Sequence, residues 1–106
     1  MESTRFVVLA DDLTSAAEAA GRLADTGRRA SALLDPTAGG EVWPCVDLDS
    51  RRLTEAEAAA RHARAVAILP AEGIYKTMDS SLRGNWAAEL AAVMRASNRS
   101  LAVVAP

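Results

Sequence analysis

The chain has 106 residues, 50% of them hydrophobic, a formal net charge of -2 and a sequence pI of about 5.3. This length suits one domain at most, and 24 alanines against four aromatic residues predict a thin core that a second domain or partner chain would cover. The mild acidity excludes a global attraction to nucleic acid or to an anionic membrane.

Single copies of cysteine and histidine narrow the chemistry further. Cys45 cannot form an internal disulfide, so the chain fits a reducing compartment. We expect Cys45 to be a buried strand residue and not a nucleophile, because His62 falls within a helical pattern and is expected on the surface of that helix. The same short supply of ligands argues against a zinc site. No stretch approaches the ~20 apolar residues of a membrane span, and the first strand begins too early for a secretory signal, so a cytoplasmic location is expected.

Hydrophobic periodicity along the chain predicts strands that alternate with helices. Short apolar runs bounded by turn residues indicate strands, whereas apolar residues recurring every three to four positions indicate helices. The predicted strands cover residues 5–10, 29–34, 42–48, 74–77 and 101–104, and the predicted helices cover residues 13–26, 55–67 and 85–97. This order predicts an α/β fold, a parallel-sheet sandwich of three layers with helices on both faces.

Local signals refine this outline. Gly27 closes the first helix, and the spacing of Thr54 and Glu57 is that of a capping box at the start of the second. Pro44 lies within the third strand and predicts either an edge position or a strand that begins at Cys45. Residues 35–41, with a proline and two glycines, predict a loop.

The segment 75–85, Tyr-Lys-Thr-Met-Asp-Ser-Ser-Leu-Arg-Gly-Asn, predicts an anion-binding loop before the third helix. The N–H groups and dipole of that helix start favour a carboxylate or phosphate. Asn85 is a favourable N-cap residue, and Gly84 allows a ligand to approach closely. Arg83 adds a two-pronged donor for a planar carboxylate, and Lys76, the only lysine, adds a second positive charge.

Polar segments follow three predicted strands, at Asp11 and Asp12, at residues 47–51 and at residues 76–83. Because the carboxyl ends of parallel strands meet at one edge of a sheet, we expect these segments to converge there. Carboxylates suit the hydroxyls of a polyol, and arginines suit an acid group, so a small sugar acid would use both. A purely structural interpretation also stays open, in which these side chains only cap helices, make turns or are solvated: Asp11, Asp12, Thr14, Asp47, Ser80, Ser81, Arg83 and Asn85.

These segments resemble the N-terminal, substrate-binding part of the four-carbon acid sugar kinase family, formerly a domain of unknown function. The resemblance is carried by Ala-Asp-Asp-Leu-Thr-Ser-Ala at 10–16, Asp-Leu-Asp-Ser-Arg at 47–51, the segment 75–85 and Val-Val-Ala-Pro at 103–106. The four blocks occur in family order over nearly the whole chain. The chain departs from the family pattern at Ser15, Leu48, Thr77 and Ser81, where the family usually has glycine, threonine, a second lysine and threonine, which bears on substrate preference.

The resemblance implies ATP-dependent phosphorylation of a four-carbon sugar acid, held by this domain, with ATP and Mg²⁺ bound by a separate C-terminal domain. A phosphate loop of the G-x-x-x-x-G-K-S/T type does not occur in the sequence, so residues 1–106 are expected to be a partial sugar-acid-binding domain, inactive alone as a kinase. A chain of this kind could be a truncated product, one piece of a split enzyme or an excised domain, and the sequence is compatible with all three. A separate nucleotide-binding domain or a second copy of the chain is the expected protein partner.

The resemblance also implies a set of substrate-side residues, none of them a metal ligand. They are Asp11, Asp12, Arg51, Lys76, Asp79, Ser80, Arg83, Gly84 and Asn85. Charge makes Asp12 the candidate catalytic residue, which orients or deprotonates the accepting hydroxyl, and makes Arg83 the candidate for binding the sugar carboxylate.

Other classes of protein stay open. A receiver domain of a signalling pathway also has an acidic pair after its first strand, and Asp47 or Asp49 and Lys76 imitate its other groups, although Lys76 comes one strand too early. A haloacid-dehalogenase-like phosphatase requires two acids one residue apart, whereas Asp11 and Asp12 are adjacent. A non-catalytic sugar-acid sensor or a decayed remnant is the third possibility.

Overall fold

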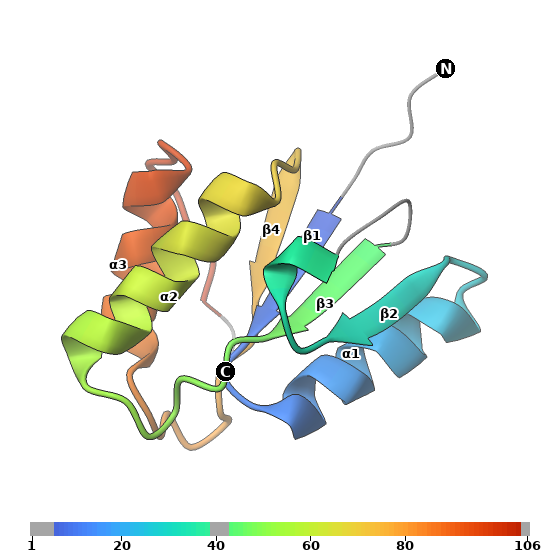
Figure 1. Ribbon diagram of the computed structural model, residues 1–106, viewed down its shortest axis with the longest axis horizontal. Coiled ribbons are helices and arrows are strands. Elements are labelled where there is room, and N and C mark those ends of the chain that lie inside the picture. The colour runs from blue at the N-terminus through green and yellow to red at the C-terminus, as the bar shows by residue number, and fades with distance from the viewer. Residues whose placement is uncertain (1–5, 39–42, 105–106) are drawn as a thin grey trace.

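The fold is a three-layer α/β sandwich around a four-stranded parallel sheet with the strand order β2-β3-β1-β4 (Figure 1). A computed structural model describes residues 6–38 and 43–104. The strands are β1 (Phe6–Ala10), β2 (Ala30–Leu33), β3 (Trp43–Asp47) and β4 (Gly73–Lys76), and the helices are α1 (Leu13–Asp25), α2 (Glu55–Ile68) and α3 (Trp86–Ala96). The predicted fold class is confirmed. Parts of predicted elements and motifs lie outside the described residues, namely Arg5, residues 39–42 and residues 105–106.

The helices divide between the two faces of the sheet. Helix α1 contacts β1, β2 and β3, while α2 and α3 pack against each other over the opposite face. The core on the α2 and α3 side is formed by residues of β1, β3 and both helices and by the residues that directly follow β3 and α2: Val7, Leu9, Val46, Leu48, Ala65, Leu69 and Val93. Because side chains alternate along a strand, Val8 and Ala10 point to the α1 side, and both are buried. Strand β1 is therefore covered on both faces from Val7 onward, as its apolar run predicts.

Pro44 led us to expect an edge position for its strand, and this expectation is wrong, because β3 lies between β2 and β1. The backbone N–H of Trp43 donates to Arg29 O at 2.6 Å on the β2 side, so the nitrogen of the next residue faces β1. The β1–β3 pairing begins only at Val8 and Cys45. The ladder between β1 and β3 thus starts one residue after Pro44, which lacks the N–H that would extend it, and an interior strand tolerates the proline at this end of the pairing.

The predicted helix starts are confirmed in position, but one cap differs. Asp12 accepts a hydrogen bond from the Ser15 N–H at 2.9 Å at the start of α1, and Thr54 Oγ1 accepts from the Glu57 N–H at 3.2 Å at the start of α2. Asn85 precedes α3, yet its side chain does not cap that helix. Its amide instead donates to carbonyl groups of the loop that follows β3.

Residues 101–104 were expected to form a strand, and this prediction is wrong. They have no regular structure, and the side chains of Leu101 and Val103 are 81% and 89% exposed. An apolar run becomes a strand only when a neighbouring strand pairs with it and another layer covers it. In the part of the chain that the structure describes, β4 pairs with β1 alone, so residues 101–104 meet neither condition. None of the described helices is long and apolar enough to cross a membrane.

Candidate functional site

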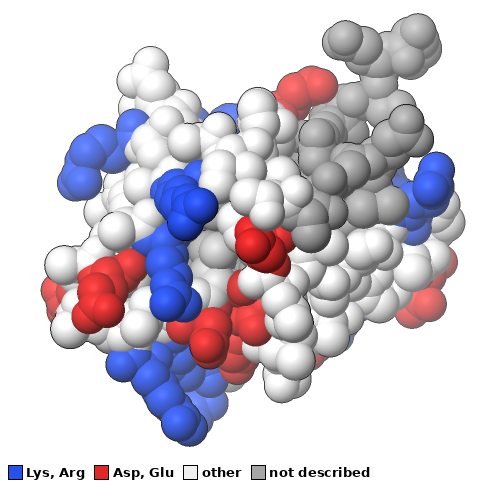
Figure 2. All heavy atoms as spheres, in the orientation of Figure 1, with Lys and Arg blue, Asp and Glu red and all other residues white. Residues whose placement is uncertain are grey.

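The chain changes direction in the sheet at the carboxyl ends of β1 and β3. The loop after β1 leads to α1 on one face, and the loop after β3 leads to α2 on the other, so the two loops diverge at the point of the sheet where ligands bind in such folds. We call the segments that surround it, residues 11–12, 47–53 and 76–85, the carboxyl rim. Figure 2 shows acidic and basic side chains gathered on the lower part of the molecule, where the strands of Figure 1 end.

Arg51 joins the first two segments of the carboxyl rim. Its Nε donates to Asp11 Oδ2 at 3.1 Å and its Nη2 to Asp11 Oδ1 at 3.2 Å, which is a two-pronged pair. Its Nη1 lies 3.2 Å from Asp12 Oδ2. The Asp11 side chain is only 3% exposed, so Arg51 supplies the counter-charge that a buried carboxylate requires.

Asp12 is the more accessible of the two acids, with its side chain 32% exposed. Burial alone would raise the pKa of Asp12, but the hydrogen bond from the Ser15 N–H and the charge of Arg51 outweigh it and hold this pKa below the usual value. Asp12 is therefore an ionised acceptor at neutral pH, oriented by the start of α1 and by Arg51.

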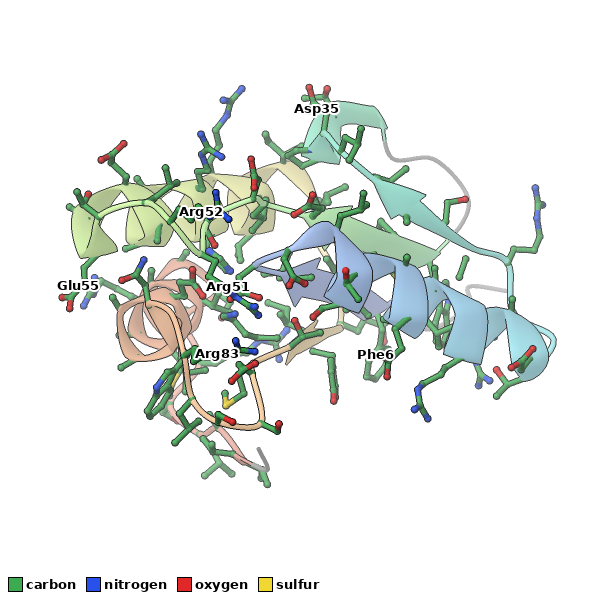
Figure 3. The ribbon with its side chains drawn as sticks, turned by 90° about the horizontal axis from the view of Figure 1, so that it is seen from below. Phe6, Asp35, Arg51, Arg52, Glu55 and Arg83 are labelled. Carbon is green, nitrogen blue, oxygen red and sulfur yellow. The ribbon has the colours of Figure 1, made fainter. Side chains whose placement is uncertain are left out.

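Arg83 brings the third segment to the same place. Figure 3 shows Arg83 and Arg51 near each other between α3 and the start of α1. Arg83 Nε and Nη2 donate to the two carboxylate oxygens of Asp79 at 3.0 and 2.6 Å, and these hydrogen bonds hold the pKa of Asp79 well below its usual range. The Arg83 side chain is still 69% exposed, so a ligand can reach its guanidinium.

Gly84 and Asn85 pack the third segment against the other two. Gly84 has φ +87°, and a Cβ at this position would lie 3.3 Å from Asp11 Oδ2 and 3.4 Å from Arg51 Cγ, so glycine permits this close approach. The Asn85 amide donates to Leu53 O at 2.8 Å. Asn85 thus ties the start of α3 to the loop after β3 and leaves the first N–H groups of α3 without a side-chain cap.

A buried polar cluster lies beneath the carboxyl rim, and sequence reasoning missed most of it. Glu89 is fully buried; its Oε2 accepts from Ser50 Oγ at 2.5 Å, and its Oε1 lies 2.9 Å from Lys76 Nζ. The Lys76 side chain is 4% exposed. Glu89 shares a helical stripe with the buried Ala92 and Val93, so its spacing was the available signal. The prediction that Lys76 binds substrate stays a prediction, and its burial beside Glu89 favours a different role, argued below.

His62 belongs to the same cluster, and its predicted surface position is wrong. It is fully buried on α2 in line with Ala58 and Ala65. Its Nδ1 lies 3.0 Å from Ala58 O and donates to it, while its Nε2 lies 3.8 Å from Glu89 Oε1. Burial and the positive charge of Lys76 lower the pKa of His62, and together they outweigh the nearby Glu89, which raises it. The pKa of His62 therefore lies below its usual value, and the ring is neutral.

The neutral state of His62 predicts a pH dependence of folding. Because the unfolded chain binds a proton at His62 near pH 6.5 and the folded chain does so only at lower pH, the free energy of unfolding should fall as pH decreases below about 6.5. The slope should reach at most about 1.4 kcal/mol per pH unit. Urea unfolding of the wild type and of His62→Gln at pH 7.5, 6.5 and 5.5 measures this. The same slope in both proteins would contradict the prediction.

The remaining predicted residues have simpler surroundings. Ser80 is exposed, and Asp47 is largely buried and accepts from the Asp49 N–H at 2.8 Å, as a turn-stabilising residue would. Burial raises the pKa of Asp47. Cys45 is buried as predicted, and burial raises the pKa of its thiol to about 11, which argues against a nucleophilic role.

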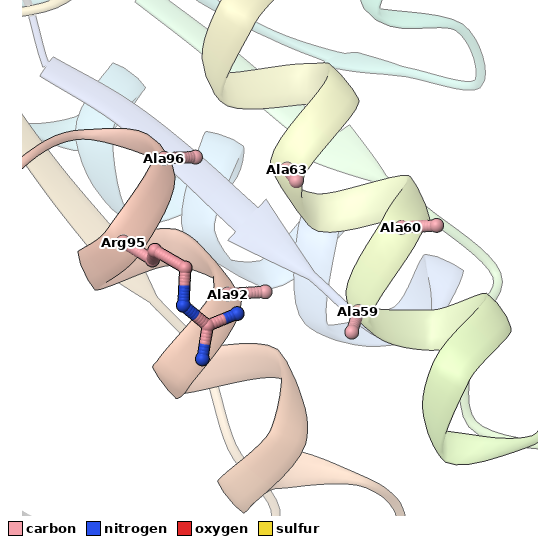
Figure 4. A pocket seen from close by; sticks show the side chains of 6 residues that line it. All are labelled: Ala59, Ala60, Ala63, Ala92, Arg95 and Ala96. Atoms are coloured by element: carbon pink, nitrogen blue, oxygen red, sulfur yellow. The ribbon is translucent and has the colours of Figure 1, made fainter.

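Two further features of the described residues bear on what the carboxyl rim could bind, the grouping of possible metal ligands and a hollow on the helical face. Over residues 6–38 and 43–104, no group of three or more His, Cys, Asp or Glu side chains could hold a metal ion. A hollow of about 300 Å³ lies between α2 and α3 and is lined by five alanines and Arg95 (Figure 4). Its lining includes no residue of the carboxyl rim.

A parallel α/β sheet whose carboxyl rim combines acids with arginines defines a small-molecule-binding domain. The family described as "Sugar-binding N-terminal domain" matches residues 6–106, and the chain belongs to it. The chain is 41% identical over 109 residues to D-threonate kinase of Cupriavidus necator and 35% identical over 109 residues to D-threonate kinase of Salmonella typhimurium. Each alignment covers 95% of this chain and 26% of the relative, so the chain spans about a quarter of the length of these curated relatives. The predicted membership of the four-carbon acid sugar kinases is confirmed.

Proposed function

We propose that this chain is the sugar-acid-binding part of an ATP-dependent kinase that phosphorylates a four-carbon acid sugar, with D-threonate as the first substrate to test. One observation carries the proposal: Arg51 holds Asp11 and Asp12 together beside an accessible Arg83. Acidic oxygens for hydroxyl groups and a cation for a carboxylate thus lie together at the carboxyl rim. The names of the two kinase relatives supply the substrate class.

Asp12 is the proposed partner of the hydroxyl that receives the phosphoryl group. Its Oδ1 accepts from the Ser15 N–H and its Oδ2 faces Arg51, so the carboxylate has a fixed direction. Because its pKa is lowered, Asp12 is a weak base, and orienting the hydroxyl suits it better than full deprotonation. Positioning of acceptor and donor is what phosphoryl transfer chiefly requires of a protein.

Arg83 is the proposed partner of the sugar carboxylate. Its exposed guanidinium already makes a two-pronged pair with Asp79, and a sugar carboxylate has the same planar shape as the Asp79 side chain. The uncapped N–H groups at the start of α3 add a positive potential next to it. Substrate binding would then exchange or share the Asp79 contact.

ATP and Mg²⁺ are assigned to a part of the kinase other than this chain. The chain corresponds to 26% of each relative, so a full-length kinase has room for a nucleotide-binding domain. Phosphoryl transfer brings metal, nucleotide phosphates and acceptor together, so that domain would face the carboxyl rim. This domain is the proposed protein partner, in the same chain or in another.

Calorimetric titration of the 106-residue chain tests the proposal. D-threonate should bind with a Kd of roughly 1 mM or tighter, whereas threitol, which has hydroxyls and no acid group, should bind at least about tenfold more weakly. Added ATP and Mg²⁺ should leave the Kd unchanged. A folded chain that binds neither compound would contradict the proposal, and a stable aspartyl phosphate on Asp47 or Asp49 after incubation with acetyl phosphate would favour a receiver domain instead.

A further inference from the structure

We propose that Glu89 is a positioning residue that fixes the loop 48–53 against the end of β4. In this proposal Lys76 is the counter-ion of Glu89 and does not touch the sugar acid. The part of the inference that concerns sugar-acid binding rests on the proposed function. The part that concerns the loop does not.

One buried carboxylate connects three segments of the chain. Glu89 projects from the first turn of α3, Ser50 lies in the loop after β3, and Lys76 is the last residue of β4. The Glu89 oxygens contact Ser50 Oγ at 2.5 Å and Lys76 Nζ at 2.9 Å. All three side chains are buried, so water cannot replace these contacts. The cluster therefore acts as an internal tie between the segments of the carboxyl rim.

Ser50 is the point where this tie reaches the candidate site. Its hydroxyl donates to Glu89, its N–H donates to Asp11 O at 3.1 Å, and its carbonyl accepts from the Leu53 N–H at 3.1 Å. Every polar group of Ser50 is thus engaged. Because Arg51 is the next residue, the direction in which its guanidinium leaves the backbone depends on Ser50.

Lys76 has the surroundings of a counter-ion. Its Nζ lies beside Glu89 and donates to Thr77 O at 2.6 Å, with 4% of the side chain exposed. To touch a ligand at the carboxyl rim, Lys76 would have to leave Glu89, and the fully buried Glu89 carboxylate would then lack its counter-charge. Removing one member of a buried pair is costly, whereas replacing both by uncharged groups of similar size is often close to neutral. That asymmetry separates a counter-ion from a ligand-binding lysine.

A double-mutant cycle uses the asymmetry. The variants are Glu89→Gln, Lys76→Met and the double variant, with Val93→Ala as a control that removes buried volume from the same helix. Three quantities are measured: Tm, amide hydrogen exchange of residues 48–53, and the Kd for D-threonate. Each single change should lower Tm by roughly 12 °C or more and speed exchange in the loop on the order of tenfold. The double variant should lie closer to the wild type than the sum of the single effects in all three quantities.

The outcomes separate the alternatives. A double variant that keeps a protected loop but loses D-threonate binding as completely as Lys76→Met would show that Lys76 touches the substrate, and would overturn the proposal. Loop exchange in Glu89→Gln that only matches Val93→Ala would overturn it too. If a single variant does not fold, Ser50→Ala, which removes the hydrogen bond to Glu89, takes its place and is compared with the double variant in the same three measurements. A wild type that binds no D-threonate, with loop exchange as expected, rejects the proposed function and upholds the positioning role of Glu89.

Discussion

Arg51→Ala is expected to abolish sugar-acid binding and to lower Tm by roughly 12 °C or more. The reason is that Arg51 is the shared partner of Asp11 and Asp12, and the Asp11 carboxylate is 3% exposed. Without Arg51, the Asp11 carboxyl group is left buried with no counter-charge, which costs on the order of 3 kcal/mol. Two repelling carboxylates then remain where the hydroxyls should bind. Thermal unfolding and calorimetric titration with D-threonate measure the two effects.

Two variants control for this change. Arg52→Ala alters the adjacent, exposed arginine and should change Tm by no more than about 2 °C. Arg51→Lys keeps the positive charge but cannot make a two-pronged pair with Asp11 while also reaching Asp12, so intermediate values of Tm and Kd are expected. If Arg51→Ala bound D-threonate as the wild type does, Arg51 would have no part in the site.

Arg83→Ala is expected to weaken D-threonate binding roughly 50-fold while Tm stays within about 2 °C of the wild type. The Arg83 side chain is 69% exposed, and exposed ion pairs contribute little to folding. Its proposed bonds to the sugar carboxylate form only in the complex, so their loss appears in binding alone. In a full-length kinase relative, the corresponding change should raise KM strongly.

Arg22 provides the matched control for Arg83. Like Arg83, it is largely exposed and pairs with an acid four residues earlier in the chain, here Glu18 on α1 and away from the carboxyl rim, although Glu18 is 62% exposed and Asp79 only 10%. Arg22→Ala should leave both Tm and the Kd for D-threonate unchanged. Equal binding losses in the two variants would point to net charge as the cause and would reject a specific role for Arg83.

The outline of the fold was predictable because local patterns and tertiary packing agree in it. The apolar run that becomes β1 is covered on both faces, and the helix starts at Asp12 and Thr54 carry the side chains that cap them. The convergence of three loops at one edge follows from parallel pairing alone. These are properties that a single sequence states directly.

The errors arose where the answer depends on a neighbour that the sequence does not name. Pro44 fits an interior strand only because β1 begins its pairing one residue later, and residues 101–104 lack the neighbour that would make them a strand. His62 was predicted on the surface and Glu89 was not singled out, because a polar residue on a buried helical stripe gives no sign of burial until its partner across the core is known. The contacts between His62 of α2, Glu89 of α3 and Lys76 of β4 identify these partners.

The position of β1 in the sheet has a consequence for how the protein is made. β1 is synthesised first, yet both strands beside it, β3 and β4, come later in the chain, and β4 much later. The nascent β1 therefore has both of its hydrogen-bonding edges open until β3 has been made, and one edge open until β4 has been made. A fragment that ends before β4 lacks the third segment of the carboxyl rim, so the ligand site should appear only after all four described strands have been made.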